Sequence, residues 1–262
     1  MPMGEGAHRS MEKRIVVIGS GNVATHLARS LTGVVQIASR TIGHARELAD
    51  AIGCGATDSI DDLDDADAYI VAVKDDAIAA IADAVPDRCR EALWLHTSGS
   101  VDKSVFASGF KRYGVLYPLQ TFSKEVAVDM SQVPLFIEGS DADVEEVIRR
   151  IALTVSPTVV SADSQLRAQM HVAAVFACNF SNYMYTLADE VLRCNGLEFA
   201  LLKPLLAETL RKAVEASPEA SQTGPAARGD RSVIDKHESM LSGEQLKIYK
   251  TVTNSILKHY NK

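Results

Sequence analysis

The stretch IVVIGSGNVATHLARSL, from Ile15 to Leu31, decides the fold. Its four leading apolar residues are typical of a buried strand, and the residues after the glycines have the polar and apolar spacing of a helix. Gly19 permits a tight turn, Gly21 lets a ligand approach the backbone, and Ala24 lets the helix pack closely on the strand. A strand, a turn and a helix with small residues at these positions predict a corner that binds a dinucleotide pyrophosphate.

The whole chain has the composition of a globular protein. Its 262 residues are 47% hydrophobic and 23% charged, enough to bury one large or two medium cores. A net charge of -7 argues against nucleic acids and anionic membranes as partners. No apolar run approaches the ~18 residues of a membrane span. The four cysteines lack CxxC spacing, so we expect no metal site and a cytoplasmic location.

The pattern changes once along the chain, which predicts two folded regions. Apolar runs alternate with helical stretches up to about Val160, an order typical of a doubly wound, mostly parallel α/β sheet, and long helical patterns follow. We predict a leader or disordered extension over 1–10, a Rossmann dinucleotide-binding domain over 11–162 and an all-α domain over 163–262. Pro118 in the run YGVLYPL has no N–H to donate, which predicts an edge strand or a bulge there.

The end of the second strand indicates which dinucleotide binds. NAD sites normally carry a carboxylate there, but this strand ends in Ser39-Arg40-Thr41. A guanidinium flanked by hydroxyls suits a 2'-phosphate, so we predict NADP (NADPH) rather than NAD. The alternative is an arginine in a surface loop that contacts only solvent. The predicted pyrophosphate contacts are residues of the first turn: Gly19, Ser20, Gly21, Asn22 and Val23.

Later strand ends are expected at the same crevice, because ligands of open α/β sheets bind beyond the carboxyl ends of the strands. Val73 and Lys74 are predicted cofactor contacts, whereas Asp75 and Asp76 are better explained as helix caps. In LHTSGS, Thr97 and Ser98 are predicted to contact the nicotinamide side and His96 the substrate. A plain Ser-Gly turn is the alternative.

A polar stripe is predicted on the first long helix of the second region. At about 100° per residue, His171, Cys178 and Asn182 share one face, with Asn179 at its edge. Polar groups on an otherwise apolar helix either pair with a neighbouring helix or line a wet pocket. In the second case His171 is the leading proton donor, because imidazole titrates near neutral pH, and the asparagines orient substrate.

Two further polar residues are candidates for substrate contact. Gln120 lies in YPLQTF, after a predicted strand, and Arg228 lies in the loop TGPAARGD, where a guanidinium could bind an anionic group. The alternative for this loop is that Asp230 caps the next helix while Arg228 contacts only solvent.

The chain resembles a family of Rossmann-like NADP oxidoreductases whose C-terminal half is a helical domain of unknown function, DUF2520. The matching stretches are VIGSGNVATHLA, LHTSGS, YPLQTF, HVAAVFACNFSNY and TGPAARGD. The arrangement is also similar to 6-phosphogluconate dehydrogenase-like and pyrroline-5-carboxylate reductase-like proteins and to deazaflavin-dependent NADP oxidoreductases. The resemblance implies a dinucleotide and a small-molecule substrate bound between the two domains, and a homodimer formed through the helical domain.

The chain departs from the hydroxyacid dehydrogenases of that wider group. They place a catalytic lysine on the first long helix and an asparagine one turn later, where this chain has His171 and Val175, with Asn179 a further turn along. A different proton donor or a different reaction is therefore expected.

These features leave two main hypotheses open. The first is an NADP(H)-dependent oxidoreductase that moves a hydride to or from a small carbonyl or imine substrate. The second is a non-catalytic NADP-binding sensor or scaffold, which needs no ordered proton donor. A third hypothesis, a structural dimer with no ligand at the glycine corner, leaves Arg40 without a phosphate to bind.

Overall fold

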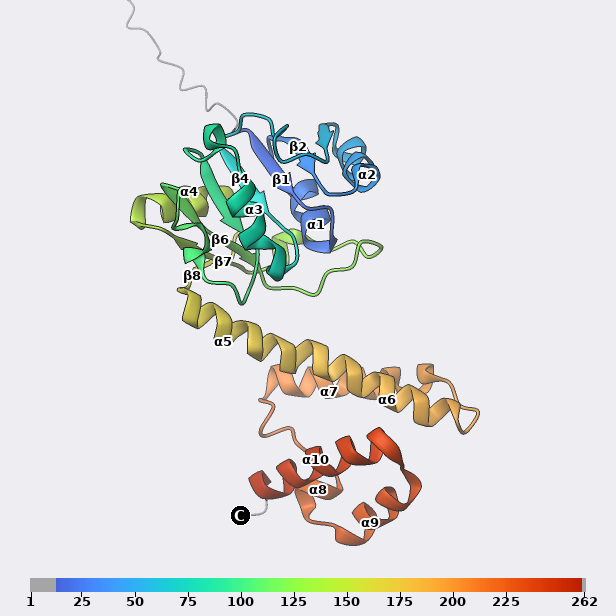
Figure 1. Ribbon diagram of the computed structural model, residues 1–262. Helices are drawn as coiled ribbons and strands as arrows, with labels where there is room; N and C mark the ends of the chain where they lie inside the picture. Colours follow the sequence, from blue (N-terminus) through green and yellow to red (C-terminus); the bar gives the residue numbers. More distant parts are fainter. Residues whose placement is uncertain (1–12, 261–262) are drawn as a thin grey trace, which may run out of the picture. The chain divides into compact units, whose positions relative to one another are not determined.

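The chain divides into two compact units, which meet in the sequence at Cys178 and Asn179. The computed structural model describes residues 13–260, so the predicted extension over 1–10 lies outside the described residues. Figure 1 shows a sheet with helices on both faces in the first unit and helices alone in the second. The change from strands to helices falls after β8, as predicted, and the first unit also includes the helix that follows.

The first unit is built on one eight-stranded sheet in the order β3-β2-β1-β4-β5-β6-β7-β8. Its strands are β1 (Ile15–Ile18), β2 (Val34–Ala38), β3 (Gly55–Thr57), β4 (Ala68–Val71), β5 (Leu93–His96), β6 (Arg112–Pro118), β7 (Leu135–Gly139) and β8 (Val159–Ser161). β6 and β7 pair antiparallel, and the other pairs are parallel. The predicted doubly wound, mostly parallel sheet is confirmed. The chain leaves β1 toward β2 on one side and returns to β4 on the other, and ligands of such sheets bind at this switch point, in a crevice beyond the carboxyl ends of the strands.

The prediction that the strand with Pro118 is an edge strand or a bulge is wrong. β6 pairs with β5 on one side and β7 on the other. Its pairing with β5 ends at Val115, before the proline, so Pro118 is the last residue of a strand that has already passed its parallel neighbour. A missing N–H is tolerated there because β5 has already ended, so no backbone hydrogen bond to β5 is lost at this position.

Helices cover both faces of the sheet. One face packs against α1 (Asn22–Ser30), α2 (Ile42–Ile52) and α4 (Ala142–Leu153), and residues of these helices share a core with alternate strand residues such as Ile70 and Leu116. The other face packs against α3 (Ile78–Ala84), short 3-10 turns, and α5 (Ser164–Ala174) beside β6 and β7. Strand residues alternate between the two faces, so Tyr117 points to the opposite face from Leu116.

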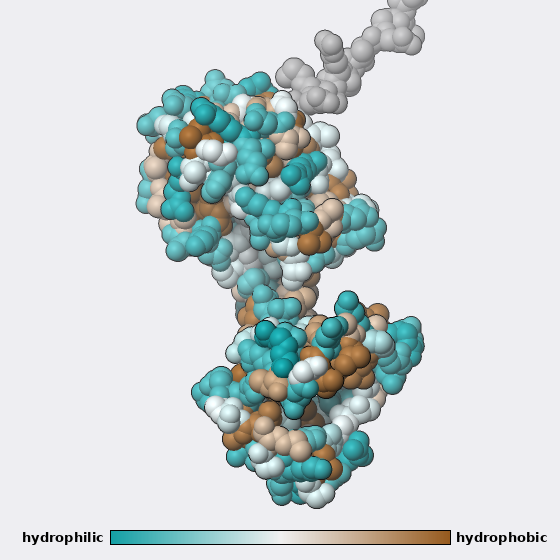
Figure 2. Space-filling model, turned by 90° about the vertical axis from the view of Figure 1, so that its right-hand side faces the viewer, coloured by the Kyte–Doolittle hydropathy of each residue, from teal (hydrophilic) through white to brown (hydrophobic). Residues whose placement is uncertain are grey.

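The second unit consists of helices. They are α6 (Ser181–Arg193), α7 (Lys203–Glu215), α8 (Pro225–Arg228), α9 (Arg231–Met240) and α10 (Gly243–Tyr260). Asp230 caps α9 by accepting a hydrogen bond from the Val233 amide, which is the alternative considered for this residue. Figure 2 shows hydrophobic side chains gathered on the surface of this unit. The most exposed of the large ones on α7 are Leu205, Leu210 and Val214, at 61%, 66% and 76%.

A π-helical segment, η5 (Val175–Phe180), joins α5 to α6. Its backbone bonds run from i to i+5, so each turn contains more residues than an α-helical turn. The spacing of about 100° per residue from which the polar stripe was predicted therefore does not hold beyond His171.

Candidate functional site

The glycine corner has the geometry of an anion site. Gly19 has φ +128, and a Cβ there would lie 2.1 Å from the Ala72 carbonyl oxygen, so the turn accepts only glycine. A Cβ on Gly21 would meet nothing within 4 Å. Gly21 is also the N-cap of α1 and supplies no side-chain hydrogen bond to the helix. No side chain caps the first amides of α1, so an anion can accept their hydrogen bonds.

The end of β2 is joined to this corner. The hydroxyls of Ser20 and Ser39 lie 2.8 Å apart. Thr41 is the N-cap of α2 and makes no side-chain capping bond, so its hydroxyl remains available to a ligand. Arg40 is exposed, and none of the ion pairs within residues 13–260 includes it. The structure thus brings the predicted pyrophosphate turn and the predicted 2'-phosphate residues to one edge of the sheet.

The loop that follows β6 is attached to α1. The side-chain amide of Asn22 donates to the Phe122 carbonyl at 2.8 Å, and His26 Nε2 lies 3.0 Å from the Ser123 carbonyl. The side chain of Asn22 is therefore engaged, and only its backbone amide is left for a phosphate. Gln120, the predicted substrate contact, is exposed in the same loop.

The strand ends β4 and β5 form the next part of the crevice. Ser100 donates to the Asp75 carboxylate at 2.5 Å, which links the loop after β5 to the loop after β4. The prediction that Asp75 and Asp76 are helix caps is wrong, because neither side chain accepts a capping bond from the short helix that begins there. Lys74 is exposed, Val73 is half-buried, and Thr97 and Ser98 are buried.

His96 is a structural residue in this geometry. Its ring is 0% exposed, and Nδ1 accepts a hydrogen bond from the Ser98 amide at 3.2 Å. Burial, together with the positive charge of Arg167, lowers the pKa of His96 to about 4. The predicted contact between His96 and substrate is not supported, because a ring with no exposed surface cannot touch a molecule bound at the surface.

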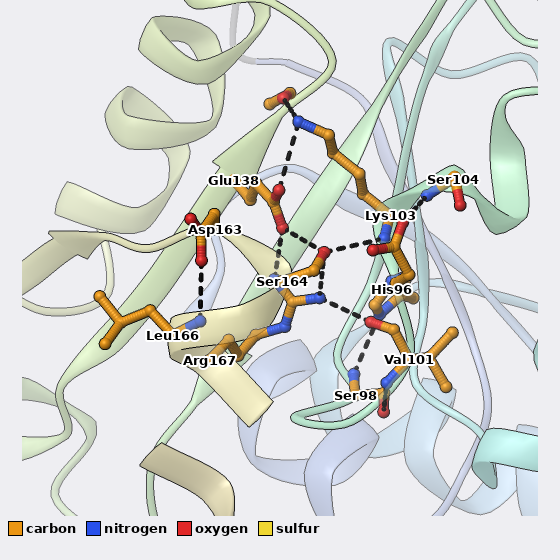
Figure 3. A network of polar contacts seen from close by, with 12 residues as sticks. His96, Ser98, Val101, Lys103, Ser104, Glu138, Asp163, Ser164, Leu166 and Arg167 are labelled. Atoms are coloured by element: carbon orange, nitrogen blue, oxygen red, sulfur yellow. Dashed lines mark hydrogen bonds and ion pairs between the residues drawn. The ribbon is translucent and has the colours of Figure 1, made fainter. Parts of the chain in front are cut away.

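A buried charge network ties α5 to the sheet (Figure 3). Arg167 donates to Glu138 at 2.5 Å and to the Val101 carbonyl at 2.6 Å. Ser164 donates to the same carboxylate at 2.8 Å, and Lys103 Nζ lies 3.2 Å from its other oxygen. Both members of the central pair are buried, so each charge depends on the other for compensation. This network was not predicted from the sequence, although a carboxylate inside the apolar run PLFIEG is a signal of a buried charge.

Tyr117 and His171 form a hydrogen-bonded pair beside this network. The phenol oxygen lies 3.0 Å from His171 Nδ1, and the two rings meet edge to face. Tyr117 is 8% exposed, and burial raises the pKa of its hydroxyl. A Cβ on Gly99 would lie 2.7 Å from His171 Nδ1 and 2.9 Å from Tyr117 Cζ, so the loop after β5 packs directly on the pair.

The remaining predicted residues belong to the second unit, and each is exposed. Asn179 lies in η5, Asn182 in α6, and Arg228 ends α8. Their predicted roles in orienting substrate and binding an anionic group remain predictions.

Two further properties bear on the chemistry. Within residues 13–260, no three His, Cys, Asp or Glu side chains are grouped so that they could hold a metal ion. Over the same residues, every helix is too short or too polar to cross a membrane.

Two family models match the chain. The model described as NADP oxidoreductase coenzyme F420-dependent matches residues 14–94, which include the glycine corner and the end of β2. The model of a domain of unknown function, DUF2520, matches residues 133–256. Among proteins with curated descriptions, none matches.

Solved structures share the whole architecture. A candidate NADP oxidoreductase from Bacteroides fragilis is 40% identical over 94% of this chain and 98% of its own, with a TM-score of 0.87. A protein from Thermotoga maritima is 22% identical over 95% and 100% of the two chains, with a TM-score of 0.77. A reductive aminase from Aspergillus terreus, solved with NADPH and ethyl-5-oxohexanoate, is 12% identical over 95% of each chain, with a TM-score of 0.73. The last two similarities show the fold alone.

The similarity to the Bacteroides protein extends over both units, and the two family models fall on the sheet unit and on the later part of the chain. The chain therefore belongs to the family of NADP oxidoreductases in which a domain of the coenzyme F420-dependent type is followed by a DUF2520 domain.

Proposed function

We propose that this protein is an NADP(H)-dependent oxidoreductase that transfers a hydride to or from a small carbonyl or imine substrate. The observation that carries the proposal is the Ser20–Ser39 contact, which sets the anion-binding turn beside the strand end that bears Arg40. A dinucleotide with a 2'-phosphate has anionic groups at both places, and the residues present fit each of them.

The rest of the crevice supports a reaction rather than binding alone. When bound, the dinucleotide supplies a hydride at its nicotinamide ring. In the strand order of this sheet, residues at the ends of β4, β5 and β6 would hold the half of the dinucleotide beyond the switch point. His171 is the proposed proton donor there, since it is paired with a residue of β6 and its ring is only half-buried.

The nature of the substrate is proposed from the chemistry and from the fold relatives. An imidazolium beside a hydride donor can protonate the oxygen or nitrogen that becomes basic as the carbon is reduced. Among the structures with this fold are a reductive aminase from Aspergillus terreus and an imine reductase from Myxococcus stipitatus solved with NADP+. Gln120 and Arg228 are proposed to contact the substrate.

We also propose a homodimer formed through the helical unit. α7 exposes Leu205, Leu210 and Val214, and a mainly apolar cavity of about 420 Å³ lies among α6, α8, α9 and α10. A second copy of the chain would remove these surfaces from water. The described cysteines form no disulfide, which suits the cytoplasmic location that we propose.

The first experiment is a titration of the purified protein with NADPH and with NADH at the same salt concentration, followed by calorimetry. We expect NADPH to bind at least about 10-fold more tightly, since the 2'-phosphate adds charge-assisted hydrogen bonds. A panel of carbonyl and imine substrates is then assayed for consumption of NADPH. Binding of neither dinucleotide would contradict the proposal, and NADPH binding without turnover of any substrate would favour the sensor instead.

A further inference from the structure

We infer that Tyr117 is a positioning residue that engages Nδ1 of His171 and so leaves Nε2 as the nitrogen that exchanges a proton with the substrate. This inference deepens the proposed function and rests on it for the reaction, but the hydrogen bond itself can be tested without turnover. Tyr117 is not among the residues that the sequence predicts for the site.

The pair is held by two elements of the same compact unit. Tyr117 is the penultimate residue of β6, and His171 lies in α5. The start of α5 is fixed by the buried Arg167–Glu138 pair, one helical turn before His171. The histidine ring is therefore placed by an anchored helix against an anchored strand, and the distance of 3.0 Å is that of a direct hydrogen bond.

Burial decides which group supplies the proton of this bond. The pKa of the Tyr117 hydroxyl is raised by burial, so the phenol keeps its proton near neutral pH. Within residues 13–260, His171 Nδ1 is the one hydrogen-bond partner found for this hydroxyl. If the neutral imidazole carried its proton on Nδ1, the buried phenol O–H would lose its acceptor, which is costly. The hydroxyl therefore donates to Nδ1, and the neutral ring carries its proton on Nε2.

The same contact serves the protonated ring. A phenol oxygen can accept as well as donate, so it can receive the Nδ1–H of the imidazolium. In the reduction, a hydride adds to the substrate carbon and the π-bond electron pair moves to the oxygen or nitrogen. The Nε2–H bond of the imidazolium breaks and its proton joins that atom, which leaves a neutral ring that donates its Nδ1–H to the phenol oxygen. The ring returns to the Nε2–H form when Nε2 takes a proton from solvent and the Nδ1 proton passes to the phenol oxygen, which releases its own proton to solvent. The phenol ends the cycle with one proton, as it began, so it orients the ring and is not consumed.

The absence of a side chain at Gly99 lets the loop after β5 pack directly on the Tyr117–His171 pair. A side chain at this position would overlap the Nδ1 side of the ring, at 2.7 Å, and the phenol, at 2.9 Å. The loop after β5 therefore has to be free of a Cβ where it passes the pair. The charged and titratable groups around the phenol come from three elements: Arg167 of α5, Asp75 after β4 and Cys178 of η5.

The test compares Tyr117→Phe with Tyr113→Phe, a matched change on the same strand whose hydroxyl makes no hydrogen bond within the described chain. Nitrogen-15 NMR of the imidazole reports the tautomer of His171, assigned with His171→Asn. We expect the Nε2–H form in the wild type and in Tyr113→Phe, and a mixture of tautomers in Tyr117→Phe. Gly99→Ala should disturb the same signals, since its methyl group displaces the ring.

Kinetics supply the second readout. We expect Tyr117→Phe to lower kcat about 10-fold to 100-fold with little change in NADPH affinity, because a misplaced catalytic group loses turnover rather than cofactor binding. Combining it with Gly99→Ala should add little, since both changes act on one pair. An Nδ1–H tautomer in the wild type, or a Tyr117→Phe variant with unchanged NMR signals, would overturn the inference. Absence of any turnover would instead count against the proposed function and leave the NMR result decisive for the pair.

Discussion

Ser20 and Ser39 share a hydrogen bond of 2.8 Å, although one follows β1 and the other follows β2. The bond fixes the glycine turn relative to the strand end that carries Arg40. Each half of the site alone is a common feature, a glycine turn or an exposed arginine. Their fixed proximity is what a ligand with anionic groups at both places would require, and it is the basis of the proposed function.

Arg40→Ala tests this relationship. We expect the affinity for NADPH to fall about 10-fold to 100-fold and the affinity for NADH to change little, because only NADPH has the phosphate that the guanidinium binds. Calorimetric titration measures both. Arg46→Ala, an exposed arginine within α2, is the control and should leave both affinities unchanged. Equal losses for the two dinucleotides in Arg40→Ala would remove Arg40 from the 2'-phosphate.

The two glycines of the corner should separate folding from binding. Gly19→Ala places a Cβ against the Ala72 carbonyl at a positive φ, so we expect the free energy of unfolding to fall by about 2 kcal/mol or more. Gly21→Ala meets open space and should leave stability nearly unchanged while NADPH binding weakens. Urea unfolding and calorimetry measure the two effects. A Gly21→Ala protein that binds NADPH normally would show that the open space does not hold the pyrophosphate.

The buried ion pair should be a major contribution to stability. Glu138→Gln leaves Arg167 and Lys103 without their counter-charge, and we expect a loss of about 3–5 kcal/mol in the free energy of unfolding. Glu146→Gln breaks an exposed pair with Arg150 and should cost about 0–1 kcal/mol. Denaturant titration compares them. Similar losses in both variants would contradict the dependence of α5 on the buried carboxylate.

The lowered pKa of His96 predicts how the free energy of unfolding depends on pH. Its pKa of about 4 in the folded protein lies below the value near 6.5 of an unfolded chain, so the unfolded state binds more protons between these values. The contribution of the neutral His96 ring to the free energy of unfolding is fully present above about pH 6.5. Up to about 3 kcal/mol of the free energy of unfolding is lost as the pH falls to about 4.

His96→Asn is the comparison, because its side-chain oxygen can still accept from the Ser98 amide but does not titrate. Unfolding is measured from pH 7 to pH 4 in both proteins. The difference between the two plots of unfolding free energy against pH gives the effect of His96 without that of the carboxylates. Parallel plots would contradict the burial of His96 as a neutral ring.

Local sequence patterns predicted the parts of the fold that depend on local chemistry. The glycine corner, the residues that end β2 and the Asp230 cap follow from which backbone shapes and terminal hydrogen bonds neighbouring residues allow. The position of β6 could not be predicted in this way. Whether Pro118 disrupts a ladder depends on where the partner strand ends, and that is set by residues elsewhere in the chain.

The site was predicted in part for the same reason. His171 was identified from its own helix, but its partner Tyr117 lies 54 positions away in the sequence, and helical periodicity contains no information about it. His96 was predicted to contact the substrate, which its burial does not support, because the sequence pattern of a polar residue at a strand end is the same whether it faces a ligand or a buried aromatic ring such as Phe106. The π-helical segment could not be predicted, because its extra residue per turn leaves no mark in the spacing of apolar and polar residues, and the face shared by the stripe was therefore inferred from α-helical spacing.

The strand order of the sheet also limits pairing between its edge strands and the strands of another chain. Its outermost strands, β3 and β8, are three residues each, so either border presents only a short row of backbone groups to another chain. The longest strand, β6, lies between two neighbours. An unfolded copy therefore finds little template on the folded protein, and the architecture itself acts against aggregation through edge pairing.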